Sequence, residues 1–243
     1  MSYRTVFMGS SDFSVSILEE LARHYPVSGV ITQADKPAGR GKQLTPPPVK
    51  LKAQELSLPI LQPEKLKTPE VLEQLVNWQP DFIVVAAYGK ILRQNILDLP
   101  RFGCINVHAS YLPRWRGASP IQTAILNGDS STGVTIMVMD AGVDTGPILS
   151  REKVLIDPDD DAITLSEKLA ITGSRLLIST LEAYLSGSQK PLPQEEDGAT
   201  YAAMIQKEDG YLDFSSPAEE LERKVRAFID WPGAVMDFGG QAL

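Results

Sequence analysis

Short apolar runs alternate with helix-spaced apolar residues as far as about Ser186. The run from Asp81 to Ala87 is apolar at nearly every position, as expected of a central parallel strand covered on both faces. Further apolar runs predict strands at 4–9, 27–31, 59–61, 133–139, 148–155 and from Cys104 onward. Helical spacing predicts helices after Asp12 and at 49–56, 68–78, 91–97, 119–126, 164–185 and 216–228. This alternation predicts an α/β fold with a doubly wound, mostly parallel, Rossmann-like sheet.

The pattern also predicts a division of the chain into domains. Thr164 to Glu167 has the form of a capping box that opens the last long helix, and Gly187 is its C-terminal stop. From Gln189 onward the chain has two prolines and few apolar residues. We therefore expect a catalytic domain over 1–188, a linker over 189–206 and the opening of a second domain over 207–243.

The segment from Gln33 to Pro48 breaks the pattern. Two glycines and three successive prolines exclude a helix there, and the segment is long for a loop inside a compact α/β domain. Between residues 34 and 52, Asp35 is the only acid, whereas five residues are basic: Lys36, Arg40, Lys42, Lys50 and Lys52. The net charge of −8 argues against a protein that coats nucleic acid indiscriminately. A basic loop on an acidic body permits a polyanionic substrate held at one place.

Composition narrows the class further. An apolar fraction of 43% is ordinary for a globular protein with a core. The single cysteine, Cys104, allows no intrachain disulfide, and with only two histidines, His24 and His108, we expect no metal site. The N-terminus lacks the long apolar run of a signal peptide, and no stretch is long enough to span a membrane. A cytoplasmic protein is the default expectation.

Three polar residues are the candidates for chemistry. Asn106 and His108 lie two positions apart in the strand that begins at Cys104, so their side chains should share one face near its carboxyl end. An amide can donate to a developing oxyanion, and a histidine can donate to it or accept a proton. Asp144, in a later Gly- and Asp-rich turn, could orient the imidazole. Each has a structural alternative: Asn106 could satisfy loop backbone, His108 could be a core residue, and Asp144 could only shape its turn.

The remaining chemistry is restricted by what the sequence lacks. No G-x-S-x-G elbow occurs, and Cys104 precedes the candidate residues. A single glycine, Gly9, follows the first strand, which disfavours a dinucleotide site. The set therefore suits direct transfer between an amine and a carbonyl, without a covalent enzyme intermediate. From the residues alone, the chain is an α/β enzyme for which acyl or one-carbon transfer is open.

A resemblance adds to this picture. The stretch Asn106-Val-His-Ala-Ser-Tyr-Leu-Pro-Arg-Trp-Arg-Gly-Ala118 resembles the signature of the folate-dependent formyltransferases. Four other segments resemble the same family: Phe7–Phe13, Ala38–Lys42, Gly133–Gly146 and Arg226–Ala234. Tyr111 departs from the pattern, because the family usually carries Leu there.

The resemblance implies a reaction and a set of binding residues. A formyl group would pass from 10-formyltetrahydrofolate to the α-amino group of methionyl initiator tRNA. Asn106 and His108 would stabilise the oxyanion, and Asp144 would assist removal of the amine proton. The folate pocket would be lined by Ser110, Tyr111, Leu112, Pro113, Ala86, Tyr88 and Asp140. Arg40 and Lys42 would contact tRNA phosphates. We further expect a monomer, and a second domain that is the start of a tRNA-binding β-barrel within which the chain ends.

Other interpretations remain open at this point. The same three residues would serve a formyltransferase acting on an amino sugar or on glycinamide ribonucleotide, or a formyl-folate hydrolase. The basic loop discriminates against these, since a small substrate has no need of it. A non-catalytic module that binds tRNA or folate is the rival from another class.

Overall fold

A computed structural model gives the fold and describes residues 3–38, 43–238 and 241–242. Within these residues seven strands form one sheet in the order β10-β9-β7-β6-β1-β2-β5. Five of them run parallel: β1 (Thr5–Gly9), β2 (Val27–Ile31), β5 (Ile60–Leu61), β6 (Phe82–Ala86) and β7 (Cys104–His108). β9 (Ser131–Val138) and β10 (Ile148–Leu155) add an antiparallel edge beside β7. The doubly wound, mostly parallel sheet is confirmed.

The burial pattern of each strand agrees with its position in the sheet. Every residue of β1, β6 and β7 is buried, which matches the unbroken apolar run of β6 and its central place in the sheet. The edge strand β10 alternates instead between inward and exposed residues. The chain passes from β1 outward to β2 and β5 and then returns to β6 on the other side of β1. The sheet therefore has a topological switch point between β1 and β6, the place where open α/β sheets bind ligands.

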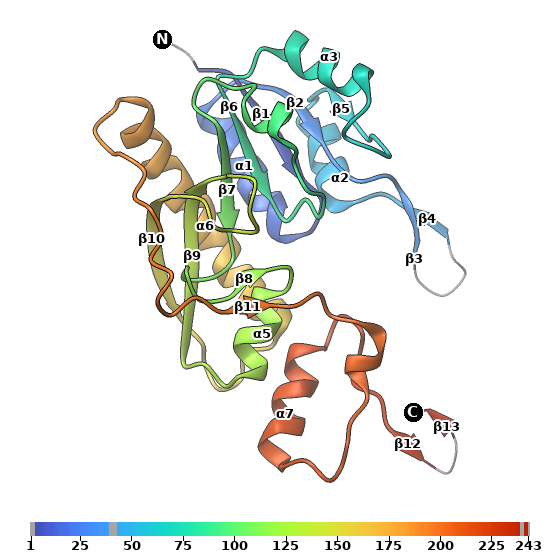
Figure 1. Ribbon diagram of the computed structural model, residues 1–243. Coiled ribbons are helices and arrows are strands. Elements are labelled where there is room, and N and C mark those ends of the chain that lie inside the picture. Colours follow the sequence, from blue (N-terminus) through green and yellow to red (C-terminus); the bar gives the residue numbers. More distant parts are fainter. Residues whose placement is uncertain (1–2, 39–42, 239–240, 243) are drawn as a thin grey trace.

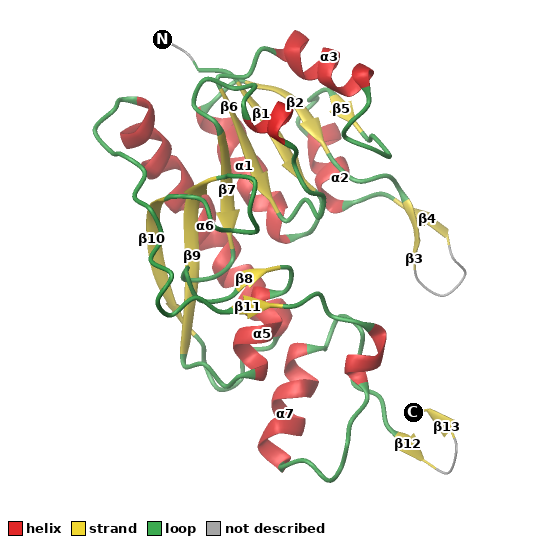
Figure 2. Cartoon of the chain, in the orientation of Figure 1, coloured by secondary structure: helices red, strands yellow, loops and turns green. Residues whose placement is uncertain are grey.

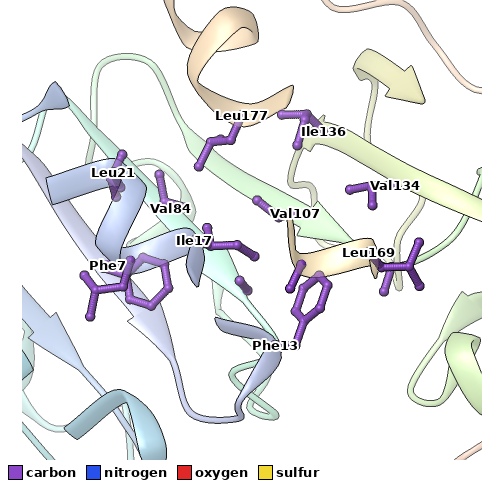
Figure 3. Packing of buried hydrophobic residues seen from close by; sticks show 14 of the residues in the cluster. Phe7, Phe13, Ile17, Leu21, Val84, Val107, Val134, Ile136, Leu169 and Leu177 are labelled. Carbon is purple, nitrogen blue, oxygen red and sulfur yellow. The ribbon is translucent and has the colours of Figure 1, made fainter. Parts of the chain in front are cut away.

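Helices cover both faces of the sheet (Figure 2). The larger core cluster is built mainly from α1 (Phe13–His24), α2 (Pro48–Glu55), α5 (Pro120–Leu126) and α6 (Ala162–Leu185), and Ala227 at the end of a later helix also belongs to it. Figure 3 shows part of this cluster, with Ile17 of α1 and Leu169 of α6 packed near Val107 of β7. The opposite face is covered by α3 (Pro69–Trp78) and α4 (Gln94–Leu97), whose apolar residues form a second cluster with Cys104.

The start of α6 differs from the prediction. Its cap is Asp161, whose carboxylate accepts from the amides of Ile163 and Thr164, while the Thr164 hydroxyl accepts from the Asp161 amide. Thr164 is thus the third helical residue and not the cap. The Thr-x-x-Glu pattern was misleading because a stronger acceptor, an aspartate, precedes it by three positions.

The segment between β2 and α2 contains a hairpin that the sequence did not predict. β3 (Lys36–Ala38) pairs antiparallel with β4 (Gln43–Thr45), and the hairpin projects from the body of the molecule (Figure 1). All three residues of β4 are exposed. Without buried residues the hairpin has no hydrophobic alternation, so the pattern of the sequence could not reveal it.

The chain after α6 pairs once with the α/β domain before it forms the C-terminal elements. β11 (Tyr201–Ala202) pairs in parallel with β8 (Arg116–Gly117). The elements beyond it are a 3-10 helix (Lys207–Gly210), α7 (Ala218–Ala227), β12 (Asp237–Phe238) and β13 (Gln241–Ala242). Helix α7 packs on the body through Phe228, which is 2% exposed, and through the Arg223 guanidinium, which donates to the carbonyl of Leu126 at 3.1 Å.

Candidate active site

Asn106 and His108 share one face of β7, as their spacing predicted. Their side chains are almost completely buried, with 8% and 6% of each residue exposed. Ile105 and Val107 point to the opposite face, into the cluster with α1 and α6. β7 lies between β6 and β9, so the two polar side chains occupy the middle of the sheet near its carboxyl edge.

Asp144 joins them from the loop after β9. The Asn106 amide donates to Oδ1 of Asp144 at 3.3 Å, and Nδ1 of His108 lies 3.6 Å from Oδ2. The backbone amide of Gly117 donates to the same Oδ2 at 2.8 Å. Groups from the strand and turn around Asn106 therefore converge on a carboxylate that lies 38 positions from Asn106 in the sequence. The structure brings the three candidate residues together in a largely buried cluster.

A backbone carbonyl determines the proton arrangement of His108. Nε2 lies 2.9 Å from the carbonyl oxygen of Trp115. A carbonyl oxygen can only accept, so Nε2 carries a hydrogen and donates it. Nδ1, which faces Asp144, is then the ring nitrogen free to gain or lose a proton. The imidazole is thereby oriented with Nδ1 toward the carboxylate.

Both loops that hold this geometry contain strained backbone. Trp115 has φ of 61° and Asp144 has φ of 53°, the left-handed region that costs a non-glycine residue about 1–3 kcal/mol. The Trp115 amide donates to the Thr200 hydroxyl at 2.9 Å, and its indole N–H donates to Asp129 at 2.7 Å. Such bonds offset the strain and keep the Trp115 carbonyl directed at His108.

The turn after β7 carries four of the residues expected to line a folate pocket. Ser110 and Leu112 are fully buried, and the Ser110 hydroxyl donates to the carbonyl of Arg114 at 2.7 Å. Thr135 of β9 fastens the turn, because its hydroxyl donates to the Ser110 carbonyl at 2.7 Å and accepts from the Leu112 amide at 3.1 Å. The turn also contains a cis peptide bond between Leu112 and Pro113.

The ring of Tyr111 packs on the antiparallel edge of the sheet. The Arg151 guanidinium lies 4.6 Å from its centroid and the Lys153 ammonium 5.3 Å, both from β10. A Cβ on Gly133 would overlap the Glu152 carbonyl oxygen and come within 3.0 Å of this ring, so the glycine leaves room for the close approach of both. Tyr111 thus takes part through its backbone in the turn and through its ring in cation–π contacts.

Ala86 and Tyr88 follow the neighbouring strand β6. The Ala86 carbonyl accepts from the Ser14 hydroxyl at 2.6 Å, and the Tyr88 carbonyl accepts from the Gln33 amide at 2.8 Å. The Tyr88 side chain is 2% exposed, and burial raises its pKa to about 12. Among the described residues its hydroxyl has no hydrogen-bond partner. It is therefore a protonated, buried donor beside the switch point of the sheet.

Asp140 and the expected tRNA-binding residues belong to different segments of the chain. The Asp140 carboxylate accepts from the Gly142 amide at 3.0 Å and from the Thr145 hydroxyl at 2.8 Å, so it shapes the loop that carries Asp144. Arg40 and Lys42, expected to bind tRNA, lie outside the described residues. At the base of the hairpin, Lys50 pairs with Asp35 at 2.7 Å.

Three contributors to the site were missed by the sequence reasoning. They are the carbonyl of Trp115, the hydroxyl of Thr135 and the side chain of Gln194, which donates to the Asp144 carbonyl at 2.8 Å. A main-chain carbonyl leaves no signal in the residue types. Thr135 occupies a strand position where a threonine is ordinary, and Gln194 lies 50 positions from Asp144 in a segment with the composition of a linker.

Neither a metal-binding cluster nor a membrane-spanning helix occurs among the described residues. No group of three or more His, Cys, Asp or Glu side chains is placed to hold a metal ion in residues 3–38, 43–238 and 241–242. None of the helices in the same ranges is both long and apolar enough to cross a membrane.

Comparison with known proteins identifies the class. The model of the family described as formyl transferase matches residues 3–181, and that of the formyl transferase C-terminal domain matches residues 204–243. The crystal structure of HypX from Aquifex aeolicus in complex with tetrahydrofolic acid has the same fold, with a TM-score of 0.75 and 18% identity. That likeness covers 100% of this chain and 37% of HypX. The class is that of enzymes that transfer a formyl group.

Curated relatives narrow the identification. Methionyl-tRNA formyltransferase from Myxococcus xanthus is 51% identical over 240 residues, which are 99% of this chain and 77% of the relative. The enzyme of the same name from Halorhodospira halophila is 52% identical over 241 residues, covering 98% of this chain and 77% of the relative. The chain belongs to the formyl transferase family and, within it, to the methionyl-tRNA formyltransferases.

Proposed function

We propose that this enzyme transfers the formyl group of 10-formyltetrahydrofolate to the α-amino group of methionyl initiator tRNA, with Asn106, His108 and Asp144 as its catalytic residues. The observation that supports these roles is the convergence of the Asn106 amide and of Nδ1 of His108 on the carboxylate of Asp144. A cytoplasmic location agrees with a tRNA substrate. The monomeric state remains a prediction from the sequence.

The proposed reaction begins with attack of the free amine on the formyl carbon. A carbon–nitrogen bond forms, and the carbonyl oxygen becomes an oxyanion. The Asn106 amide and a protonated Nδ1 of His108 are the donors that can reach such an oxygen, because Nε2 is occupied by the Trp115 carbonyl. Preorganised donors in a buried site stabilise this charge more than water does.

Asp144 is the proposed acceptor of the proton that the amine loses. The attacking amine becomes positively charged and must lose a proton, which the Asp144 carboxylate accepts directly or through a water molecule. Collapse of the intermediate breaks the bond from the formyl carbon to N10 of the folate, and N10 takes up a proton. The products are formylated methionyl-tRNA and tetrahydrofolate, and no covalent enzyme intermediate is formed.

The binding roles follow the same edge of the sheet. Ser110 to Pro113 after β7, Ala86 and Tyr88 after β6, and the loop at Asp140 flank the three catalytic residues and would line the folate pocket. Arg40 and Lys42 would contact phosphates of the tRNA from the segment between β3 and β4. The domain division at 188 and 206 is part of the proposal, with the tRNA-binding domain beginning at about residue 207.

The test is a formyl-transfer assay with 10-formyltetrahydrofolate and three acceptors: methionyl initiator tRNA, an amino sugar nucleotide and glycinamide ribonucleotide. We expect transfer to the tRNA with kcat/KM at least about 10³ times that for either small amine. Asp144→Asn should lower kcat by about 10²-fold or more, whereas Asp159→Asn, at an exposed aspartate, should leave it unchanged. Preferred transfer to a small amine would overturn the substrate assignment.

A further inference from the structure

Residues 189–202, which we call the strap, cross the catalytic body between α6 and the C-terminal elements. The strap is fastened at both ends. Leu192 exchanges two backbone hydrogen bonds with Ile148 of β10, at 2.7 and 2.8 Å, and β11 pairs with β8 (Figure 1). The segment that the sequence predicts as a linker therefore lies along the two loops that hold the active site.

Gln194 lies between these two attachments, and both the nitrogen and the oxygen of its side-chain amide form hydrogen bonds. Its Nε2 donates to the carbonyls of Asp144 and Gly146, each at 2.8 Å. Its Oε1 accepts from Nε and Nη2 of Arg116, at 3.1 and 2.9 Å. Carbonyls only accept and a guanidinium only donates, so the orientation of the amide is unambiguous.

Arg116 makes this arrangement rigid. Its side chain is fully buried, so its charge requires partners, and Gln194 supplies two of the hydrogen bonds. Its charged partner, Glu196, lies at 3.2 Å and has a side chain that is 78% exposed. Arg116 also stands next to Gly117, whose amide holds the Asp144 carboxylate. One glutamine thus joins the loop after β7 to the loop that carries Asp144.

We propose that Gln194 is a positioning residue for the formyl transfer, acting by holding the main chain on both sides of Asp144. Asp144 has a left-handed backbone, which persists only where its surroundings determine it. Gln194 fixes the carbonyls of residues 144 and 146, and so the direction from which the Asp144 carboxylate meets Asn106 and His108. The proposal rests on the proposed role of Asp144. It also means that the segment leading to the C-terminal domain is part of the catalytic frame.

The substitution Gln194→Glu separates this role from simple packing. Glutamate keeps the size of the side chain and still accepts from Arg116, but it cannot donate to the two carbonyls and repels them. Gln194→Met, which has similar length and no polar group, is the second variant. Glu195→Gln, at the exposed neighbour, is the matched control.

The readout is steady-state formyl transfer to methionyl-tRNA. A folate-binding titration counts the folded sites, so that kcat is expressed per site. Displacement of a catalytic group by about 1 Å can cost 10²-fold, so we expect kcat per site to fall by about 10- to 100-fold in both Gln194 variants. KM for either substrate should change less than about twofold, and Glu195→Gln should match the wild type. Unchanged kcat per site, or loss of folate binding in both variants, would overturn the proposal.

A double-mutant cycle shows whether Gln194 acts through Asp144. In an Asp144→Asn background, Gln194→Glu should lower kcat by less than about twofold further, because the group that it positions has already lost its function. A purely structural role predicts losses that multiply, and that outcome would overturn the positioning role. If Asp144→Asn alone is fully active, the catalytic role proposed for Asp144 fails instead, so the two failures are distinguishable.

Discussion

Two loops leave the same edge of the sheet and differ in almost every physical respect. The chain after β2 forms the β3–β4 hairpin, whose described residues 43–45 are all exposed, with Leu44 71% exposed. The chain after β7 forms a turn in which Ser110, Leu112 and Arg116 are fully buried. In the proposed function, the first presents charge to a large partner and needs only accessibility, whereas the second holds atoms for a reaction. The Ser110 hydroxyl, the Leu112 amide and the Arg116 guanidinium of the second loop are each hydrogen-bonded within the fold.

The largest expected effect comes from the buried side of this comparison. His108→Ala should lower kcat for formyl transfer by about 10²- to 10⁴-fold, and Asn106→Ala by about 10²- to 10³-fold, because each removes a donor to the oxyanion. His24→Ala and Asn77→Ala, at exposed residues on α1 and α3, are the matched controls and should have full activity. Near wild-type turnover in either buried variant would indicate a site elsewhere or a non-catalytic module.

How far the sequence predicts this region can be judged from those same residues. An unbroken apolar run identified β6, and in β7, where apolar and polar residues alternate, the period of a strand placed Asn106 and His108 on one face. The sequence could nominate Asp144 but not its distance from them, since only the fold brings the two loops together. The Trp115 carbonyl and Gln194 were beyond prediction, because a main-chain acceptor and a distant glutamine carry no local pattern.

Substitutions in the hairpin should weaken tRNA binding and leave the rate of the chemical step unchanged. Replacing Arg40 and Lys42 together by Ala should raise KM for tRNA by about 10²-fold or more and leave kcat and folate affinity unchanged, since each charge-assisted hydrogen bond to phosphate is worth about 1.5–3 kcal/mol. Removing each phosphate-binding charge should also lower the slope of log KM against log salt concentration by about 1. The double replacement of Arg4 and Arg101, exposed at the opposite edge of the sheet, serves as the control. Unaltered tRNA kinetics would remove the tRNA-binding role from the hairpin.

A threonine in each region tests the contrast in rigidity. Thr135→Val removes the hydroxyl that bridges the Ser110 carbonyl and the Leu112 amide, and leaves both backbone groups unpaired in a buried turn. Unfolding free energy should fall by about 1–3 kcal/mol, measured by urea denaturation, and kcat should fall with it. Thr45→Val in β4 should change stability by less than about 0.5 kcal/mol. Equal losses in the two variants would mean that the hairpin is as constrained as the turn.

The smallest effect concerns the base of the hairpin at acid pH. Hydrogen bonds from Gln62, and then from Lys50, hold the pKa of Asp35 below its ordinary value. A lowered folded-state pKa means that the carboxylate's contribution is present above the unfolded pKa of about 3.9 and disappears as pH falls through the folded value. Below about pH 4, the amides of Lys36 and Ala38 should therefore exchange hydrogen faster relative to those of β7, and Asp35→Asn should abolish that pH dependence. If the β7 amides became unprotected in the same range to the same extent, the hairpin and the catalytic turn would form one cooperative unit, and the two loops would not differ in rigidity.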